Sequence, residues 1–498
     1  MLRGFSIFFL LLALAAVALE MHLRSQARAH ARQMEMAAER ALLRGGLPGL
    51  LRARALTLGW AAVARDAEAA ATLALANALL ASEYGLGETR TALTAADIVE
   101  STPRASPRAQ ALKLASRALV EVTLGHPERA EALARQSVAL GHRQASPLFV
   151  LGRVRFRQGD PAAAATAFQA ALVREPGLVE ARVDWAEAWL ELGEPARARE
   201  ALLAALRRTP DHVRAHLLWA ETEAASPGGG ATAAAWETAC ARDAARSPFV
   251  ASACALARAR KAWQGRDWET AVRFAQSAGR YRPPEPRAFA GAAQLLASLG
   301  AVDRASPFVD EAVRGASPAL PSIRWARLAL DLGRGHLAEL PAEVPVASSP
   351  WAPFMRARVA LATGSTKALT EALSESEDGD ADLAALAAAA KGHPAGVADD
   401  GRAALDPARA YVLGMRARLA GDLALAADLL ARALHRHGAA CRAAGEYLEV
   451  CRVLGRIPDA SALAWLASEN ARCVNLPAAA AAAAEKRKPA RRAAHGPR

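Results

Sequence analysis

Aromatic residues, cysteines and lysines are scarce in this chain of 498 residues. Phe, Trp and Tyr together make up 5% of it, and there are five Cys. β-Branched residues are also few, whereas Ala and Leu recur in short segments separated by Gly and Pro. Such a composition favours helices over strands and excludes a β-sandwich or a β-barrel. We therefore predict an all-α fold.

Sequence motifs of common catalytic and metal sites are missing as well. The chain has no P-loop, no HExxH, no GxSxG and no Rossmann glycine motif, and its cysteines form no CxxC pair. His435 and His437 are two residues apart on a predicted helix, so they do not share a face. We expect no enzyme activity, no metal site and no cofactor.

One long uncharged apolar run, Phe5 to Leu19, lies near the N-terminus between Arg3 and Glu20. As a helix it would reach about 22 Å, less than the roughly 30 Å of a bilayer's hydrocarbon core. Its length suits a secretory signal peptide, and Ala16-Val17-Ala18 is a candidate cleavage site. Residues 1–23 are therefore expected to be a signal anchor or a signal peptide.

Basic residues gather at the two ends of the chain. Residues 1–65 carry nine Arg and three Glu, and residues 477–498 carry six Lys or Arg and one Glu, within a formal charge of +12. The middle is nearly neutral, so no specific nucleic-acid binding is expected, because that function needs a basic folded surface. The tail could contact an anionic polymer or a membrane.

The side of the membrane is indicated by two opposing signals. Five Arg between residues 24 and 44 follow the apolar run, and the positive-inside rule places such a segment in the cytoplasm. A basic start followed by a short apolar run normally exports what comes after it. We expect a single N-terminal anchor in a bacterial inner membrane, with the periplasmic side favoured over the cytoplasmic side.

Internal repeats supply the clearest pattern. Gly125, Gly159 and Gly193 are spaced by 34 residues, and each is followed two residues later by Pro. Gly can close one helix in the left-handed conformation, and Pro suits the first turn of the next. The same interval separates small residues of the following helix, Ala130, Ala164 and Ala198. The spacing predicts a series of helical hairpins.

These residues resemble the tetratricopeptide repeat (TPR) family, whose 34-residue unit is a helix–turn–helix. Residues 145–178 match the family's spacing at Leu148, Leu151, Gly152, Ala164, Phe168, Ala171 and Pro176. The resemblance covers residues 111–222 and 407–472 well and is weak between them. It implies an α-solenoid of TPR-like hairpins, with an N-terminal hydrophobic helix in front, whose concave face binds proteins or peptides.

Segments rich in Pro, Gly or acidic residues mark further domain boundaries in the chain. After the N-terminal segment we expect basic juxtamembrane helices over 24–65, an N-terminal TPR array over 66–225, degenerate hairpins over 231–340, a C-terminal TPR-like array over 350–476, and a disordered Ala-rich basic tail over 477–498.

The resemblance also implies a partner-binding groove, because the first helix of each unit lines the concave face. The positions carried over are Phe149, Arg153 and Phe156, with Arg157 beside them, and Glu187 and Leu190 in the next unit. Ordinary core packing is the other interpretation of the two Phe. The family's clamp for a C-terminal carboxylate needs Asn residues that are absent here.

Four of the five cysteines can be paired by position. Cys240 and Cys254 are each seven residues from Ser247, and Cys441 and Cys473 are each sixteen from Ile457. Equal distances from the turn of an antiparallel hairpin put two residues at the same height, which permits a disulfide. Buried free thiols are the alternative.

Together these features predict a non-catalytic TPR scaffold at the bacterial cell envelope. It would bind proteins or peptides along its concave surface and support assembly of a membrane-associated complex. A second hypothesis is an envelope glycan-binding or lipopolysaccharide-binding protein that uses its basic chain ends.

Overall fold

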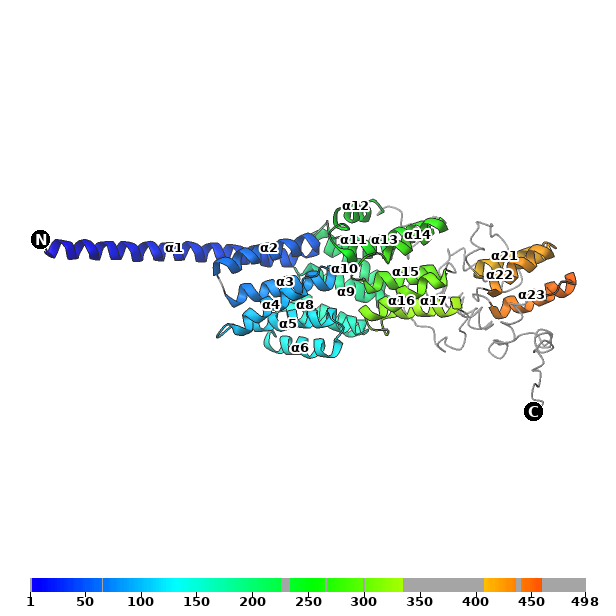
Figure 1. Cartoon of the computed structure of the whole chain (residues 1–498), viewed down its shortest axis with the longest axis horizontal. Helices are drawn as coiled ribbons and strands as arrows, with labels where there is room; N and C mark the ends of the chain where they lie inside the picture. The colour runs from blue at the N-terminus through cyan, green and yellow to red at the C-terminus, as the bar shows by residue number, and fades with distance from the viewer. Residues whose placement is uncertain are drawn as a thin grey trace, which may run out of the picture. The chain divides into compact units, whose positions relative to one another are not determined.

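The computed structural model describes residues 2–64, 66–224, 233–264, 267–298, 301–334, 407–435 and 440–458, and no strand occurs among them (Figure 1). The chain divides into two compact units. Unit 1 comprises Met1–Thr222, Gly230–Ala251 and Gly315–Leu320, and unit 2 comprises Glu223–Gly229, Ser252–Arg314 and Pro321–Arg498. The predicted all-α class is confirmed.

Helices succeed one another along unit 1 with short connections. They are α1 (Leu2–Arg44), α2 (Gly46–Ala64), α3 (Ala67–Tyr84), α4 (Thr89–Ser101), α5 (Pro107–Thr123), α6 (Pro127–Leu140), α7 (Ala145–Arg157), α8 (Pro161–Arg174), α9 (Val179–Leu192), α10 (Pro195–Arg208), α11 (Val213–Ala224) and α12 (Ala233–Asp243). The next helix, α13 (Pro248–Gln264), begins at the end of this unit.

Unit 2 continues with the same kind of element. Its helices include α14 (Trp268–Ala278), α15 (Pro286–Ser298), α16 (Val302–Gly315), α17 (Pro321–Arg334), α21 (Pro407–Leu419), α22 (Leu423–His435) and α23 (Ala440–Leu454). Helix α15 packs against α14 and α17, and α22 packs against α21 and α23.

The hairpin turns are built as the repeat spacing predicts. Gly159 lies in the turn between α7 and α8 and has a φ of +86°. Gly193 lies in the turn between α9 and α10 and has a φ of +84°. These angles are left-handed, where a Cβ is costly. Pro161 and Pro195 then occupy the first turn of α8 and α10, where no intrahelical N–H bond is lost.

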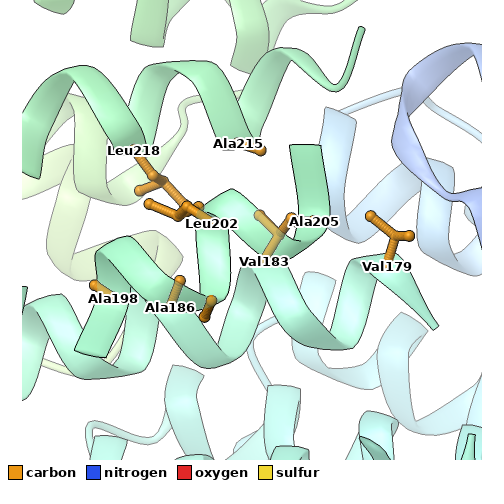
Figure 2. Packing of buried hydrophobic residues seen from close by; sticks show 9 residues of the cluster. Val179, Val183, Ala186, Ala198, Leu202, Ala205, Ala215 and Leu218 are labelled. Carbon is orange, nitrogen blue, oxygen red and sulfur yellow. The ribbon is translucent and has the colours of Figure 1, made fainter. Parts of the chain in front are cut away.

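Small residues set how closely the two helices of a hairpin approach. A Cβ on Gly152 of α7 would lie 2.5 Å from the ring of Phe168 on α8, so only Gly fits beneath that ring. Between successive hairpins, an apolar core joins α9, α10 and α11 (Figure 2). Its members are Val179, Val183, Ala186, Ala198, Ala201, Leu202, Ala205, Ala215 and Leu218. Buried apolar faces of neighbouring hairpins thus form one continuous core, as an α-solenoid requires.

The N-terminal helix α1 is 43 residues long, and every residue from Val17 to His30 is exposed. Its C-terminal part packs on α2. In the described part of the chain, no helix has a window both long and apolar enough to span a bilayer.

Candidate functional site

Helix α3 is enclosed in unit 1, where it packs against α2, α4 and α5, and side chains of its last turn reach α7, α9 and α11. Seventeen of the 18 residues of α3 are buried. Its sequence, AEAAATLALANALLASEY, is rich in Ala, and these small side chains let neighbouring helices pack closely around it. Asp66 caps its start by accepting from the Ala69 N–H at 2.8 Å, and Gly85 ends it with a φ of +65°. Sequence rules for capping therefore fix both ends of the helix.

Contacts from the last turn of α3 reach three of the solenoid's helices. Glu83 lies 2.6 Å from Arg153 Nε of α7 and 2.7 Å from Arg214 Nη1 of α11. Tyr84 donates its phenolic hydrogen bond to Glu180 Oε1 of α9 at 3.0 Å. The body of α3 packs against α5. The last turn of α3 is thus tied by polar contacts to the first helices of successive hairpins.

Arg214 is the most connected cation of this cluster. Its Nη2 donates to Asp184 Oδ1 at 2.8 Å and to Glu187 Oε2 at 2.9 Å, and Nη1 donates to Glu180 Oε2 at 3.3 Å. Arg153 adds ion pairs to Asp184 at 3.3 Å and to Glu187 at 3.6 Å. A shared set of carboxylates therefore couples α7, α9 and α11 beneath α3.

Glu180 connects the cluster to the start of α2. Its Oε1 accepts from the Gly46 N–H at 2.7 Å and lies 3.5 Å from His212 Nε2. Burial alone would raise the pKa of Glu180, but His212, Arg214 and the Gly46 N–H outweigh burial and lower that pKa to about 2. The negative charge of Glu180 is thus favoured in the interior because donors surround it.

Asp184 behaves in the opposite way. Burial raises its pKa to about 8, and the neighbouring carboxylates Glu83 and Glu187 act in the same direction against the two arginines. Asp184 therefore binds a proton more tightly than an ordinary aspartate does, even though both arginines lie against it.

The residues predicted to line an open groove are mostly inside the protein. Phe149, Phe156 and Arg153 are only 1%, 3% and 4% exposed. Phe149 packs on Phe168 with ring centroids 6.1 Å apart, and Arg153 lies over the Phe156 ring at 6.0 Å. Instead of facing an open surface, the two Phe side chains form part of the core, and Arg153 belongs to the buried charge cluster that Glu83 of α3 joins.

The remaining predicted groove residues follow the same arrangement. Glu187 is 8% exposed and bonded to Arg214, and half-buried Arg157 donates to the Ser82 carbonyl of α3 at 3.3 Å. Leu190 is half-buried beside the core of Figure 2. Arg157 and Glu187 are therefore engaged by the chain itself.

Glu83, Asp184 and Arg214 belong to the cluster but were not predicted from the sequence. A signal was present in the repeat itself, because equivalent positions 34 residues apart carry opposite charges. Arg153 is followed by Glu187 and Glu180 by Arg214 at that interval. Equivalent positions of stacked hairpins are adjacent, so such pairs predict ion pairs between neighbouring units.

The cysteines are in two chemical states. Cys240 of α12 and Cys254 of α13 are each disulfide-bonded. Cys451 is a free buried thiol whose pKa is raised by burial. The other predicted pair, Cys441 and Cys473, includes a residue outside the described part of the chain. Across the described residues, no group of three or more His, Cys, Asp or Glu side chains is arranged to hold a metal ion.

Stacked helical hairpins with Gly-x-Pro turns define the fold as an α-solenoid. Residues 155–221 match the family model described as tetratricopeptide repeat, so the resemblance to that family is confirmed over α8, α9, α10 and most of α11.

Solved structures similar to the chain include one from work on PilF of Pseudomonas aeruginosa. It has 15% sequence identity and a TM-score of 0.27, and covers 52% of this chain and 96% of that one. A monomeric mutant of IFIT1 solved with m7Gppp-AAAA has 14% identity and a TM-score of 0.30, and covers 77% of each chain. No curated protein sequence matches the chain.

Proposed function

We propose that this protein is a non-catalytic tetratricopeptide scaffold at the bacterial cell envelope. It binds protein partners and supports assembly of a membrane-associated complex. The observation that carries the proposal is the stack of TPR hairpins whose polar groove residues are committed to structural ion pairs rather than to a catalytic arrangement.

We infer that α3 occupies the groove expected along the first helices of the hairpins, which changes where a partner should dock. Because α3 covers the first helices of the hairpins in unit 1, a partner binds an outer surface of the array while α3 stays in place. The groove then acts as a rigid core that holds the hairpins in register.

Placement at the envelope rests on the N-terminal helix and on cysteine chemistry. The exposed stretch from Val17 to His30 begins at the end of the apolar run, which suits a tether that holds the array away from a membrane. Disulfide-bonded Cys240 and Cys254 favour an oxidising compartment, which supports the periplasmic side.

Capture of partners from detergent-solubilised membranes tests the proposal. The tagged full chain should recover a reproducible set of proteins, and the same set should be recovered with Glu83→Gln, which weakens the hold on α3. Glu131→Gln, which removes an exposed carboxylate of the Arg135 pair, is the matched control. Recovery that rises with Glu83→Gln alone would mean that partners compete with α3 for the groove.

Deletion of residues 2–23 tests the tether separately. These residues precede the part of α1 that packs on α2, so the array should still fold. The deleted chain should move from the membrane fraction to the soluble fraction. Full retention in the membrane would refute the tether.

A further inference from the structure

A cavity of about 670 Å³ opens in unit 1 at the start of α2, where the Gly46 N–H reaches Glu180 of the buried cluster. Its wall is made by the last turns of α1, the first turns of α2, the α8–α9 turn and the end of α10. A volume of this size suits a ligand larger than a single inorganic ion. Four arginines line it: Arg40, Arg44, Arg52 and Arg208.

The four arginines are exposed, and within the described residues none of them forms an ion pair with a carboxylate. Two acidic residues also line the cavity, but both have other partners. Glu175 Oε1 accepts from the Gly177 N–H at 3.0 Å, and Asp211 Oδ2 lies 3.4 Å from Arg242 Nη1. Four arginines against two carboxylates leave the cavity wall with an excess of positive charge.

A fifth arginine, Arg182, lies close to Arg208 of the cavity wall. Burial, and then the charge of Arg208, lower the pKa of Arg182 in the first turn of α9. Arg182 donates to the Pro176 carbonyl at 2.9 Å, which holds its guanidinium close to this edge. An anion in the cavity would reduce the repulsion between the two arginines.

The hydrogen-bond donors of the cavity favour a ligand chain that carries carboxylates over a compact phosphate. Phosphate sites at helix starts rely on converging backbone N–H groups. At the start of α2, the Gly46 N–H is already donated to Glu180, and Pro48 has no N–H. The arginines instead stand on three helices around an opening whose wall also carries Ala37, Ala41 and Val179. Spread charges and apolar patches together suit a peptide rather than a small anion.

We propose that this cavity binds an acidic peptide segment that also carries apolar side chains. Arg44, Arg52 and Arg208 pair with its carboxylates, since a guanidinium binds a carboxylate through two parallel hydrogen bonds. The apolar side chains of the segment lie on Ala37 and Leu43, which are half-buried in the cavity wall. This site is distinct from the α3-filled groove and does not depend on the proposed scaffold function.

Fluorescence anisotropy with the full chain in detergent tests the site. The probe is a short fluorescein-labelled peptide that alternates glutamate with leucine, and the control peptide has glutamine in place of glutamate. We expect Arg44→Ala and Arg208→Ala each to weaken binding about five-fold, and the double variant about twenty-fold. Arg143→Ala, which removes an exposed arginine outside the cavity, should bind like the parent.

Three results would overturn the proposal. The first is equal binding of the glutamine peptide, and the second is an effect of Arg143→Ala as large as that of the double variant. The third is binding of inorganic pyrophosphate by a chain that does not bind the glutamate peptide. All the substituted arginines are exposed, so unchanged circular dichroism and thermal unfolding would show that each variant is folded.

Discussion

Glu83, at the end of α3, lies 2.6 Å from Arg153, in the middle of α7, and both side chains are almost fully buried. The two residues are 70 positions apart in the sequence and join a helix that precedes the repeats to a helix within them. Their contact explains why a position expected to meet a partner is occupied by the protein itself.

Removing one partner of this contact should destabilise unit 1. Arg153→Ala leaves the carboxylate of Glu83 buried with less compensation, which costs about 3–5 kcal/mol for a buried pair. Urea unfolding followed by tryptophan fluorescence measures the loss. Arg135→Ala, in an exposed pair with Glu131, should cost under about 0.5 kcal/mol. Equal shifts for the two variants would contradict a buried cluster.

Asp184 should make stability fall as pH rises. Its pKa is raised from 3.8 to about 8 in the folded protein, so the folded state holds a proton that the unfolded state has lost across that window. The stability from this proton is complete below about pH 4 and is lost as pH rises through about 8, with a slope of at most about 1.4 kcal/mol per pH unit. Asp184→Asn should remove this slope in urea titrations. An unchanged slope would mean that Asp184 is ionised in the folded protein.

Glu180 should act at acid pH with the opposite sign. Its pKa is lowered from 4.5 to about 2, so it stabilises the fold above about pH 4.5, and this contribution is lost as pH falls towards 2. Glu180→Gln should be less stable than the parent at neutral pH, and the difference should shrink on acidification. Glu128→Gln, at an exposed carboxylate, is the control and should track the parent throughout.

Two glycines distinguish close packing from open space. Gly152→Ala should destabilise the α7–α8 hairpin, because the added Cβ would lie 2.5 Å from the Phe168 ring. The expected loss is about 1–3 kcal/mol, as for overpacked cores. Gly87→Ala, with no atom within 4 Å of the new Cβ, should be close to neutral. Thermal unfolding of both variants measures the contrast, and equal melting temperatures would refute the packing of Phe168 on α7.

Thiol labelling checks the cysteine chemistry. Iodoacetamide added to the denatured, unreduced protein should leave Cys240 and Cys254 unmodified and should alkylate Cys451. Reduction before denaturation should expose all three to the reagent. Peptide mass spectrometry identifies the modified sites. Alkylation of Cys240 without reduction would remove this support for an oxidising compartment.

Local rules within one repeat were enough to predict the hairpins. Gly159 and Pro161 fix a turn by backbone geometry alone, and Gly152 with Phe168 fixes how the two helices meet. The position of α3 could not be obtained in this way. Its Ala-rich sequence satisfies the pattern of any buried helix, and which groove it fills depends on contacts between Glu83 and residues 70 or more positions later.

The candidate site residues were predicted from their positions within one repeat. Arg153 and Glu187 lie in the buried charge cluster, and the sequence does not show which residues bury them. The charge alternation from Glu180 to Arg214 at one repeat length is readable, because stacked units bring equivalent positions together.

Hydrogen exchange measured by mass spectrometry on the intact chain tests most directly whether α3 fills the groove. Peptides from Leu73 to Tyr84 should exchange as slowly as peptides from α7 and α9, while those from Val17 to His30 of α1 should exchange quickly. In Arg153→Ala the protection of α3 should fall before that of α9. Rapid exchange of α3 in the parent protein, at the rate of the exposed part of α1, would contradict its burial in the groove.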